Sequence, residues 1–150
     1  MGGTIIEFTP TWDQIAVLII LYLNKRKISK QKLSTLLYLV YKELKDLAPK
    51  YIEPLEDSNF YIDIKTKQII IEPNIDAILN SLSYIWEAVN FSLKDSVVYL
   101  TDEGYKVAEA IMNDPEYKDE ADIIMKVVVQ YKDLSEEGLM NLILENLKHS

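Results

Sequence analysis

Few residues in this sequence could perform catalytic chemistry. It contains no cysteine, and its one histidine, His149, is the next-to-last residue. Disulfides, thiolate zinc sites and cysteine nucleophiles are therefore excluded, together with most imidazole chemistry. A phosphate-binding loop needs closely spaced glycines, and these are widely separated. The glycines are Gly2, Gly3, Gly104 and Gly138.

Carboxylates are the remaining candidates for acid–base or metal chemistry. They gather in two places, at Glu53, Glu56 and Asp57 and at Asp119, Glu120 and Asp122. Neither group has the regular spacing and the turn glycine of a calcium loop, so solvated surface charges are the simpler interpretation. We therefore expect a protein that is not an enzyme, with no catalytic residue, no cofactor and no metal.

A run of basic residues raises the question of nucleic-acid recognition. Residues 24–50 carry eight basic side chains and two acidic ones, and the densest part is a predicted turn between two helices. Cations and free backbone amides at this turn could meet phosphate, assisted by Lys65, Lys67 and Lys94 on predicted hairpin tips. A solvated lysine-rich turn remains the simpler explanation. The candidate nucleic-acid patch consists of Lys25, Arg26, Lys27, Lys30, Gln31 and Lys32.

Aromatic side chains with a polar end are abundant, with ten tyrosines and two tryptophans. Such residues are enriched at protein interfaces, although most of them pack in cores. Tyr38 and Tyr41 lie beside the apolar stripe of one predicted helix, and Tyr84 lies off the stripe of another. These three tyrosines are the candidate residues for contact with another protein.

The balance of charge argues against a membrane or a nucleic acid as the main partner. The formal net charge is −8 and the isoelectric point is about 4.7. The longest apolar run, Ile15 to Leu23, is far shorter than the ~20 residues of a spanning helix. It also lacks the charged leader of a signal peptide. We expect a soluble, cytoplasmic protein that does not enter a membrane.

Acidic residues concentrate in the last third of the chain. Residues 101–147 hold twelve acidic side chains and four lysines, in contrast to the basic segment 24–50. Such asymmetry favours an interaction surface, although two solvated helix faces would produce the same pattern.

Periodicity predicts a mostly helical α+β protein. Helices are predicted at 12–25, 30–47, 75–89, 101–112, 118–131 and 135–147, with caps at Thr11, Ser29, Asn74 and Thr101. Strands are predicted at 5–8, 59–64, 67–72 and 97–100, of which the middle two form a hairpin, and 90–96 is predicted as a loop. The first helix is apolar on all sides and should be central.

No internal repeat or linker divides the sequence, so we expect one domain over residues 1–150. Its core would span 12–112, and a C-terminal helical pair would occupy 116–148.

The order of three helices, a strand and a further helix resembles a winged helix-turn-helix domain, in which a Leu-Thr-x-x-Gly step often joins the strand to the helix. Residues 100–104 have this step. Three stretches also resemble the Panacea-type antitoxin family, a winged-helix-like family of prokaryotes and their mobile elements. They are residues 28–40 with the pattern Lys-Leu-x-x-Leu-Leu-Tyr-Leu, Ile71-Glu72-Pro73, and residues 128–144. Glu72 stands where that family tends to have glycine.

The resemblance implies a winged-helix-type core with an inserted β-hairpin and a closing helical pair. It also implies a non-catalytic regulatory or neutralising protein that acts through protein–protein contacts. The partner would be a toxin or another regulatory protein, and the chain could also form a homodimer. In this family setting, an acidic helical pair would cover a basic partner or mimic a phosphate-rich surface.

The alternative function is that of a winged-helix DNA-binding transcription regulator. Segment 75–89 would then occupy the recognition position, yet no lysine or arginine lies between Lys67 and Lys94. Its outward face would offer Asp76, Asn80, Ser83, Tyr84 and Glu87. DNA phosphates would repel Asp76 and Glu87, so DNA binding would have to use the basic turn at 25–32. Such binding would be weak and would depend steeply on the salt concentration.

Overall fold

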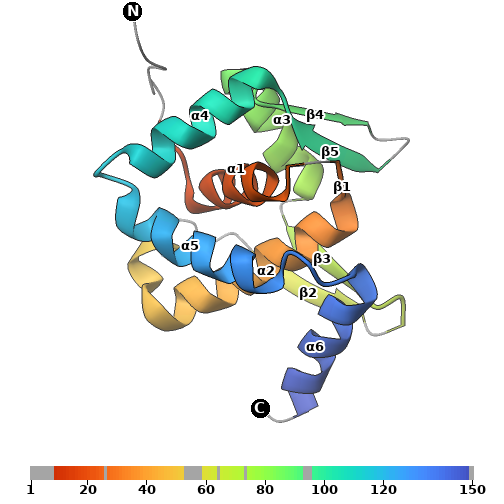
Figure 1. The fold of residues 1–150 in the computed structure, drawn as a ribbon. Helices are drawn as coiled ribbons and strands as arrows, with labels where there is room; N and C mark the ends of the chain where they lie inside the picture. Colours follow the sequence, from red (N-terminus) through yellow and green to blue (C-terminus); the bar gives the residue numbers. More distant parts are fainter. Residues whose placement is uncertain are drawn as a thin grey trace, which may run out of the picture.

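The computed structural model describes residues 9–25, 27–52, 59–63, 65–72, 74–92 and 96–148. These residues form a mostly helical α+β structure, which confirms the predicted class (Figure 1). The helices are α1 (Trp12–Asn24), α2 (Lys30–Leu47), α3 (Ile75–Trp86), α4 (Asp102–Asn113), α5 (Lys118–Tyr131) and α6 (Glu136–Lys148), and a short 3₁₀ helix, Pro49–Tyr51, follows α2. The strands are β1 (Ile28–Ser29), β2 (Asn59–Asp63), β3 (Gln68–Glu72), β4 (Val89–Ser92) and β5 (Val97–Leu100).

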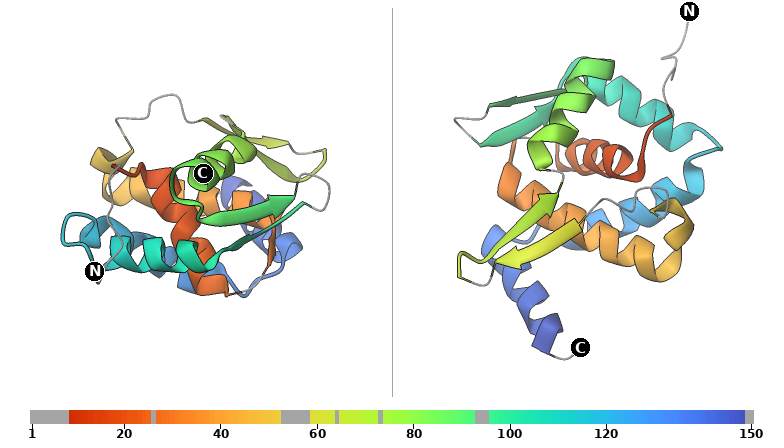
Figure 2. Two further views of the ribbon diagram at one scale, coloured as in Figure 1. Left: turned by 90° about the horizontal axis from the view of Figure 1, so that it is seen from above. Right: turned by 180° about the vertical axis from the view of Figure 1, so that it is seen from behind.

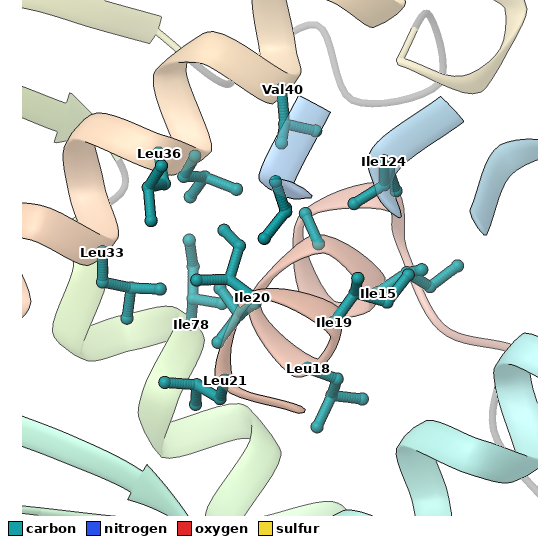
Figure 3. Packing of buried hydrophobic residues seen from close by; sticks show 14 of the residues in the cluster. Ile15, Leu18, Ile19, Ile20, Leu21, Leu33, Leu36, Val40, Ile78 and Ile124 are labelled. Carbon is teal, nitrogen blue, oxygen red and sulfur yellow. The ribbon is translucent and has the colours of Figure 1, made fainter. Parts of the chain in front are cut away.

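Helix α1 lies at the centre of the packing, as its sequence predicts. Every residue from Ile15 to Leu21 is at most 1% exposed. The helix contacts α2, α3, α4, α5 and β5. Figure 3 shows its side chains among those of Leu36 of α2, Ile78 of α3 and Ile124 of α5. A helix that is apolar all round is stable in water only when other elements enclose it.

The strands form two separate antiparallel sheets (Figure 2). The first has the order β1-β5-β4, with Ile28 opposite Val98 and Val89 opposite Leu100. The second is the hairpin β2–β3, whose register confirms the predicted pairing of residues 59–64 with 67–72. The predicted strand at 5–8 lies outside the described residues.

The segment after α3 differs from the prediction. The helix ends at Trp86 rather than at residue 89, because Glu87 adopts a left-handed conformation with φ of 52°. Val89–Ser92 then forms β4, whereas residues 90–96 were predicted as a loop. The strand depends on its pairing with β5, which local periodicity does not reveal.

The predicted helix caps are confirmed. The backbone N–H of Thr11 donates to Oε1 of Gln14 at 3.0 Å, which is half of a capping box. Side-chain oxygens of Ser29, Asn74 and Thr101 accept backbone N–H groups in the first turns of α2, α3 and α4. Each cap pairs an N–H group that the helix itself leaves free.

Helices α5 and α6 both pack against α2, and α5 also contacts α1 and α4. Ala121, Ile124, Val127 and Val128 of α5 therefore belong to the same buried cluster as α1. Helix α6 buries Leu139, Met140 and Ile143, and its last turns extend beyond the body of the molecule (Figure 1). No helix in the described ranges is long and apolar enough to cross a membrane.

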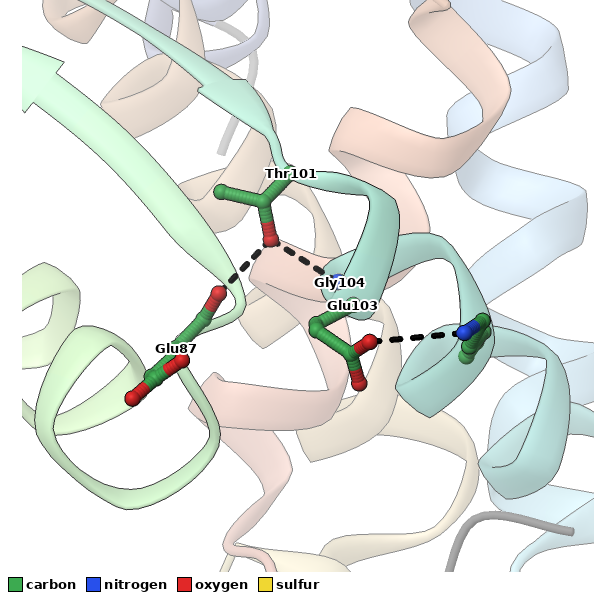
Figure 4. A network of polar contacts seen from close by, with 5 residues as sticks. Glu87, Thr101, Glu103 and Gly104 are labelled. Atoms are coloured by element: carbon green, nitrogen blue, oxygen red, sulfur yellow. Dashed lines mark hydrogen bonds and ion pairs between the residues drawn. The ribbon is translucent and has the colours of Figure 1, made fainter.

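The start of α4 is joined to the end of α3 by a polar network (Figure 4). The hydroxyl of Thr101 donates to the carbonyl of Glu87 at 2.6 Å and accepts the N–H of Gly104 at 3.0 Å. The N–H of Thr101 donates to the carbonyl oxygen of Ala88 at 3.0 Å. A Cβ atom on Gly104 would lie 2.0 Å from that oxygen, so only glycine fits here.

We expect Gly104→Ala to lower the free energy of unfolding by roughly 1–3 kcal/mol, because the added methyl group must displace backbone. Gly138→Ala is the matched control. Gly138 has the same local motif, with its N–H bonded to Ser135, but its Cβ would meet nothing closer than that hydroxyl at 3.2 Å. Chemical denaturation measures both variants, and equal losses would contradict this account.

Candidate functional site

The six residues of the predicted nucleic-acid patch lie in different environments. Lys25 and Lys27 are exposed, and the Lys27 ammonium lies 5.4 Å from the centre of the Tyr99 ring. Lys30 forms an ion pair with Asp76 of α3 at 2.9 Å. Arg26 lies outside the described residues. The ammonium of Lys30 is therefore neutralised by Asp76 within the molecule and is not free to bind phosphate.

Lys32 is also engaged, whereas Gln31 borders an open surface. The ammonium of Lys32 donates to the carbonyl oxygen of Lys132 at 2.7 Å, and Gln31 borders a hollow beside β3. The N–H of Lys30 donates to the carbonyl of Ser96 at 2.9 Å, while the N–H of Lys32 donates to Ser29. Two of the amides that could have met an anion at the start of α2 are thus already bonded.

The supporting lysines on the hairpin tips are only partly described. Lys65 and Lys67 are exposed in the turn between β2 and β3, and Lys67 adopts a positive φ of 55°. Lys94 lies outside the described residues.

The outward face of α3 is neutral in its middle and second half. Asn80 and Tyr84 are exposed, and Tyr84 is 91% exposed. Ser83 donates to the carbonyl of Val89 at 2.9 Å, and the carboxylate of Asp76 is held by Lys30. Glu87 is exposed at the end of the helix. Helix α3 therefore presents an amide and a phenol to solvent, with a carboxylate at its end.

Tyr38 and Tyr41 come together on one side of α2 and border a concave surface. This aromatic hollow has a volume of about 360 Å³, and its lining includes Phe60 of β2. The Phe60 ring centre lies 4.6 Å from that of Tyr41 and 5.7 Å from that of Tyr38. Trp12 of α1 supports the rings from behind, with its centre 5.8 Å from that of Tyr41. The half-buried rings therefore form one wall that packs against a core residue, Trp12.

The rim of the aromatic hollow is charged. Lys42, Lys45 and Asp46 of α2 complete its lining, and all three are exposed. The ammonium of Lys45 lies 5.9 Å from the centre of the Tyr41 ring. Burial raises the pKa of the Tyr38 phenol, so this group remains a neutral hydrogen-bond donor at physiological pH. The site therefore combines apolar walls with two cations and one anion.

Tyr84 does not belong to this site. It stands on α3 beside Asn80, Ser81 and Ser83, and no residue of that group lines the aromatic hollow. Sequence analysis also missed Phe60 as a site residue. Its only signal was the alternation of apolar residues in the predicted strand, which places Phe60 on the face of the hairpin that turns toward α2.

Among the residues that the structure describes, no three histidine, cysteine or carboxylate side chains are grouped so that they could hold a metal ion. No family model matches the chain, and no curated protein or solved structure is significantly similar to it.

One carboxylate is buried away from the hollow. Glu120, in the first turn of α5, is only 7% exposed. Burial raises the pKa of its carboxyl group from 4.5 to about 7, because the ionised form loses its hydration. The folded protein thus retains a proton that the unfolded chain releases, so the free energy of unfolding should fall as pH rises between these two values.

We expect Glu120→Gln to be more stable than the unmodified chain at pH 8, by roughly 1–3 kcal/mol, because the amide needs no proton. The difference should shrink as the pH falls toward 4.5, the unperturbed pKa. Asp122→Asn, at an exposed position on the same helix, is the control and should show no such trend. Denaturant titrations at several pH values measure both. A difference that is independent of pH would contradict the assignment.

Proposed function

We propose that this chain is a non-catalytic regulatory or neutralising protein that acts by binding another protein, in the manner of an antitoxin. The aromatic hollow of α2 and β2 carries this proposal. Binding energy at protein interfaces concentrates where an anchoring side chain fills a preformed pocket with aromatic walls. Tyr38, Tyr41 and Phe60 provide such walls. The packing of Tyr41 and Phe60 on Trp12 keeps the cost of ordering these side chains low.

The charges at the rim indicate which partner the hollow favours. Lys42 and Lys45 are exposed beside the rings, and Asp46 only partly balances them. An aromatic or aliphatic anchor flanked by acidic residues would fill the hollow and meet these cations. Electrostatic complementarity of this kind selects partners and speeds their association.

We further propose that the core is of the winged-helix type. The order α1-β1-α2-α3-β4-β5, together with the sheet order β1-β5-β4, supports this arrangement. The hairpin β2–β3 would then be an insertion between α2 and α3. In such a core α3 takes the recognition position, where neutral Asn80 and Tyr84 suit a polypeptide better than a phosphate backbone.

The antitoxin part of the proposal is supported by the resemblance to the Panacea-type family. The pattern Lys-Leu-x-x-Leu-Leu-Tyr-Leu covers residues 32–39, in α2, and its tyrosine is Tyr38. One residue of the resemblance therefore lies in the aromatic hollow.

The double charge reversal Lys42→Glu with Lys45→Glu tests this function. A tagged chain is co-expressed with the product of the neighbouring open reading frame, and the co-purified protein is quantified. We expect the double variant to lose most of the partner, since two attractive contacts become repulsive, with binding falling roughly tenfold or more.

Lys126→Glu is the control, because Lys126 is exposed on α5 and does not line the hollow. It should retain the partner. Equal retention by the double variant and the control would contradict the assignment of the hollow, and a chain that captures nothing from its native host would count against the function itself.

DNA binding remains the alternative, because Lys25 and Lys27 are exposed next to β1. With Lys30 and Lys32 engaged elsewhere, few cations remain for phosphate contacts, so we expect a DNA column to release the chain at physiological salt. The net charge of −8 adds a general repulsion. Retention that Lys25→Ala with Lys27→Ala abolishes, but Lys118→Ala with Lys126→Ala preserves, would instead favour a DNA-binding regulator.

A further inference from the structure

A second hollow lies on a different surface, along β3. It has a volume of about 470 Å³ and is lined by residues of α2, β3 and α3, among them Gln31, Ser34, Ile69, Ile70, Ile71 and Asn74. No described residue of its lining also lines the aromatic hollow. The two hollows are therefore separate surfaces.

This hollow follows the edge of β3. Successive residues of a strand point to opposite faces, and here Ile69 and Ile71 are buried while Ile70 is 44% exposed. All three nevertheless border the hollow, so it runs along the edge of the strand rather than over either face. Among the described strands, β3 pairs only with β2. Its outer edge thus offers backbone N–H and carbonyl groups to an additional strand.

The charges in the hollow neutralise each other. Among the lining residues that the structure describes, the charged ones are Lys30 and Asp76, whose Nζ and Oδ1 atoms are 2.9 Å apart. The ammonium of Lys30 also lies 5.3 Å from the centre of the Phe91 ring. Neither charge is left for a charged ligand, so an uncharged occupant complements this surface best.

The position of α2 indicates whether the edge of β3 pairs with a second copy of this chain or with a single extended segment of another polypeptide. Helix α2 contacts β3, and its residues Gln31 and Ser34 form part of the lining. A second copy that paired through its own β3 would bring its own α2 to the same face of the joined sheet, where the first α2 already lies. A single extended segment brings no helix with it.

We propose that β3 accepts an extended, uncharged segment of a partner polypeptide as a third strand. Main-chain hydrogen bonds to the edge of β3 provide the affinity, and alternate side chains provide the specificity. On the outer face, a β-branched or aliphatic side chain packs beside Ile70. On the inner face, small or polar side chains meet Gln31 and Ser34.

The test uses the complete chain and an immobilised library of random octapeptides. We expect it to enrich uncharged peptides in which β-branched residues alternate with small polar ones. Ile70→Lys places a charge beside the hollow and should weaken the binding of the enriched peptides by roughly tenfold or more. Circular dichroism and thermal unfolding verify that the variant is folded.

Tyr61→Lys is the matched control. Tyr61 lies directly opposite Ile70 in the hairpin and is similarly exposed, at 51%, but it does not border the hollow. It should leave binding unchanged, as should Lys42→Glu with Lys45→Glu, which separates this site from the aromatic hollow. The proposal is overturned if no peptide is enriched, if the enriched peptides are charged, or if Ile70→Lys and Tyr61→Lys weaken binding equally. A homodimer that Ile70→Lys dissociates would also overturn it, in favour of a second copy.

Discussion

The burial of α1 on every side is the constraint on which the rest of the structure depends. Ile15 to Leu21 leave no polar face that could remain in water, so four other helices and β5 must enclose this helix. Each enclosing element packs its apolar face against α1 and turns its polar face toward solvent. The functional surfaces are consequently the outer faces of elements whose inner faces were committed to the core.

Helix α2 shows how this constraint divides one element between structure and recognition. Its first turn is tied to α3 by Lys30, to the end of α5 by Lys32 and to α6 by a hydrogen bond from Ser29 to Glu136. The basic residues Lys30 and Lys32, which the sequence suggests as a phosphate-binding surface, therefore connect α2 to neighbouring elements instead. Farther along the helix, Lys42 and Lys45 are exposed at the surface beside the aromatic rings.

The hairpin β2–β3 connects the two candidate binding surfaces. One strand supplies Phe60 to the aromatic hollow, while the edge of the other borders the second hollow. The hairpin packs against the core through Phe60, Ile62, Ile69 and Ile71, and β3 contacts α2, so both surfaces share one support. Such a support lets a protein present two different contacts without rearranging its core.

The sequence by itself determined the helices, the hairpin and the central place of α1, because apolar spacing and capping side chains act over a few neighbouring residues. Only the tertiary structure decided that Val89–Ser92 is a strand and that Phe60 joins Tyr38 and Tyr41. It also decided that Lys32 bonds to Lys132, 100 positions away. These outcomes depend on partners that are distant in the chain, and local spacing carries no information about which distant groups will meet.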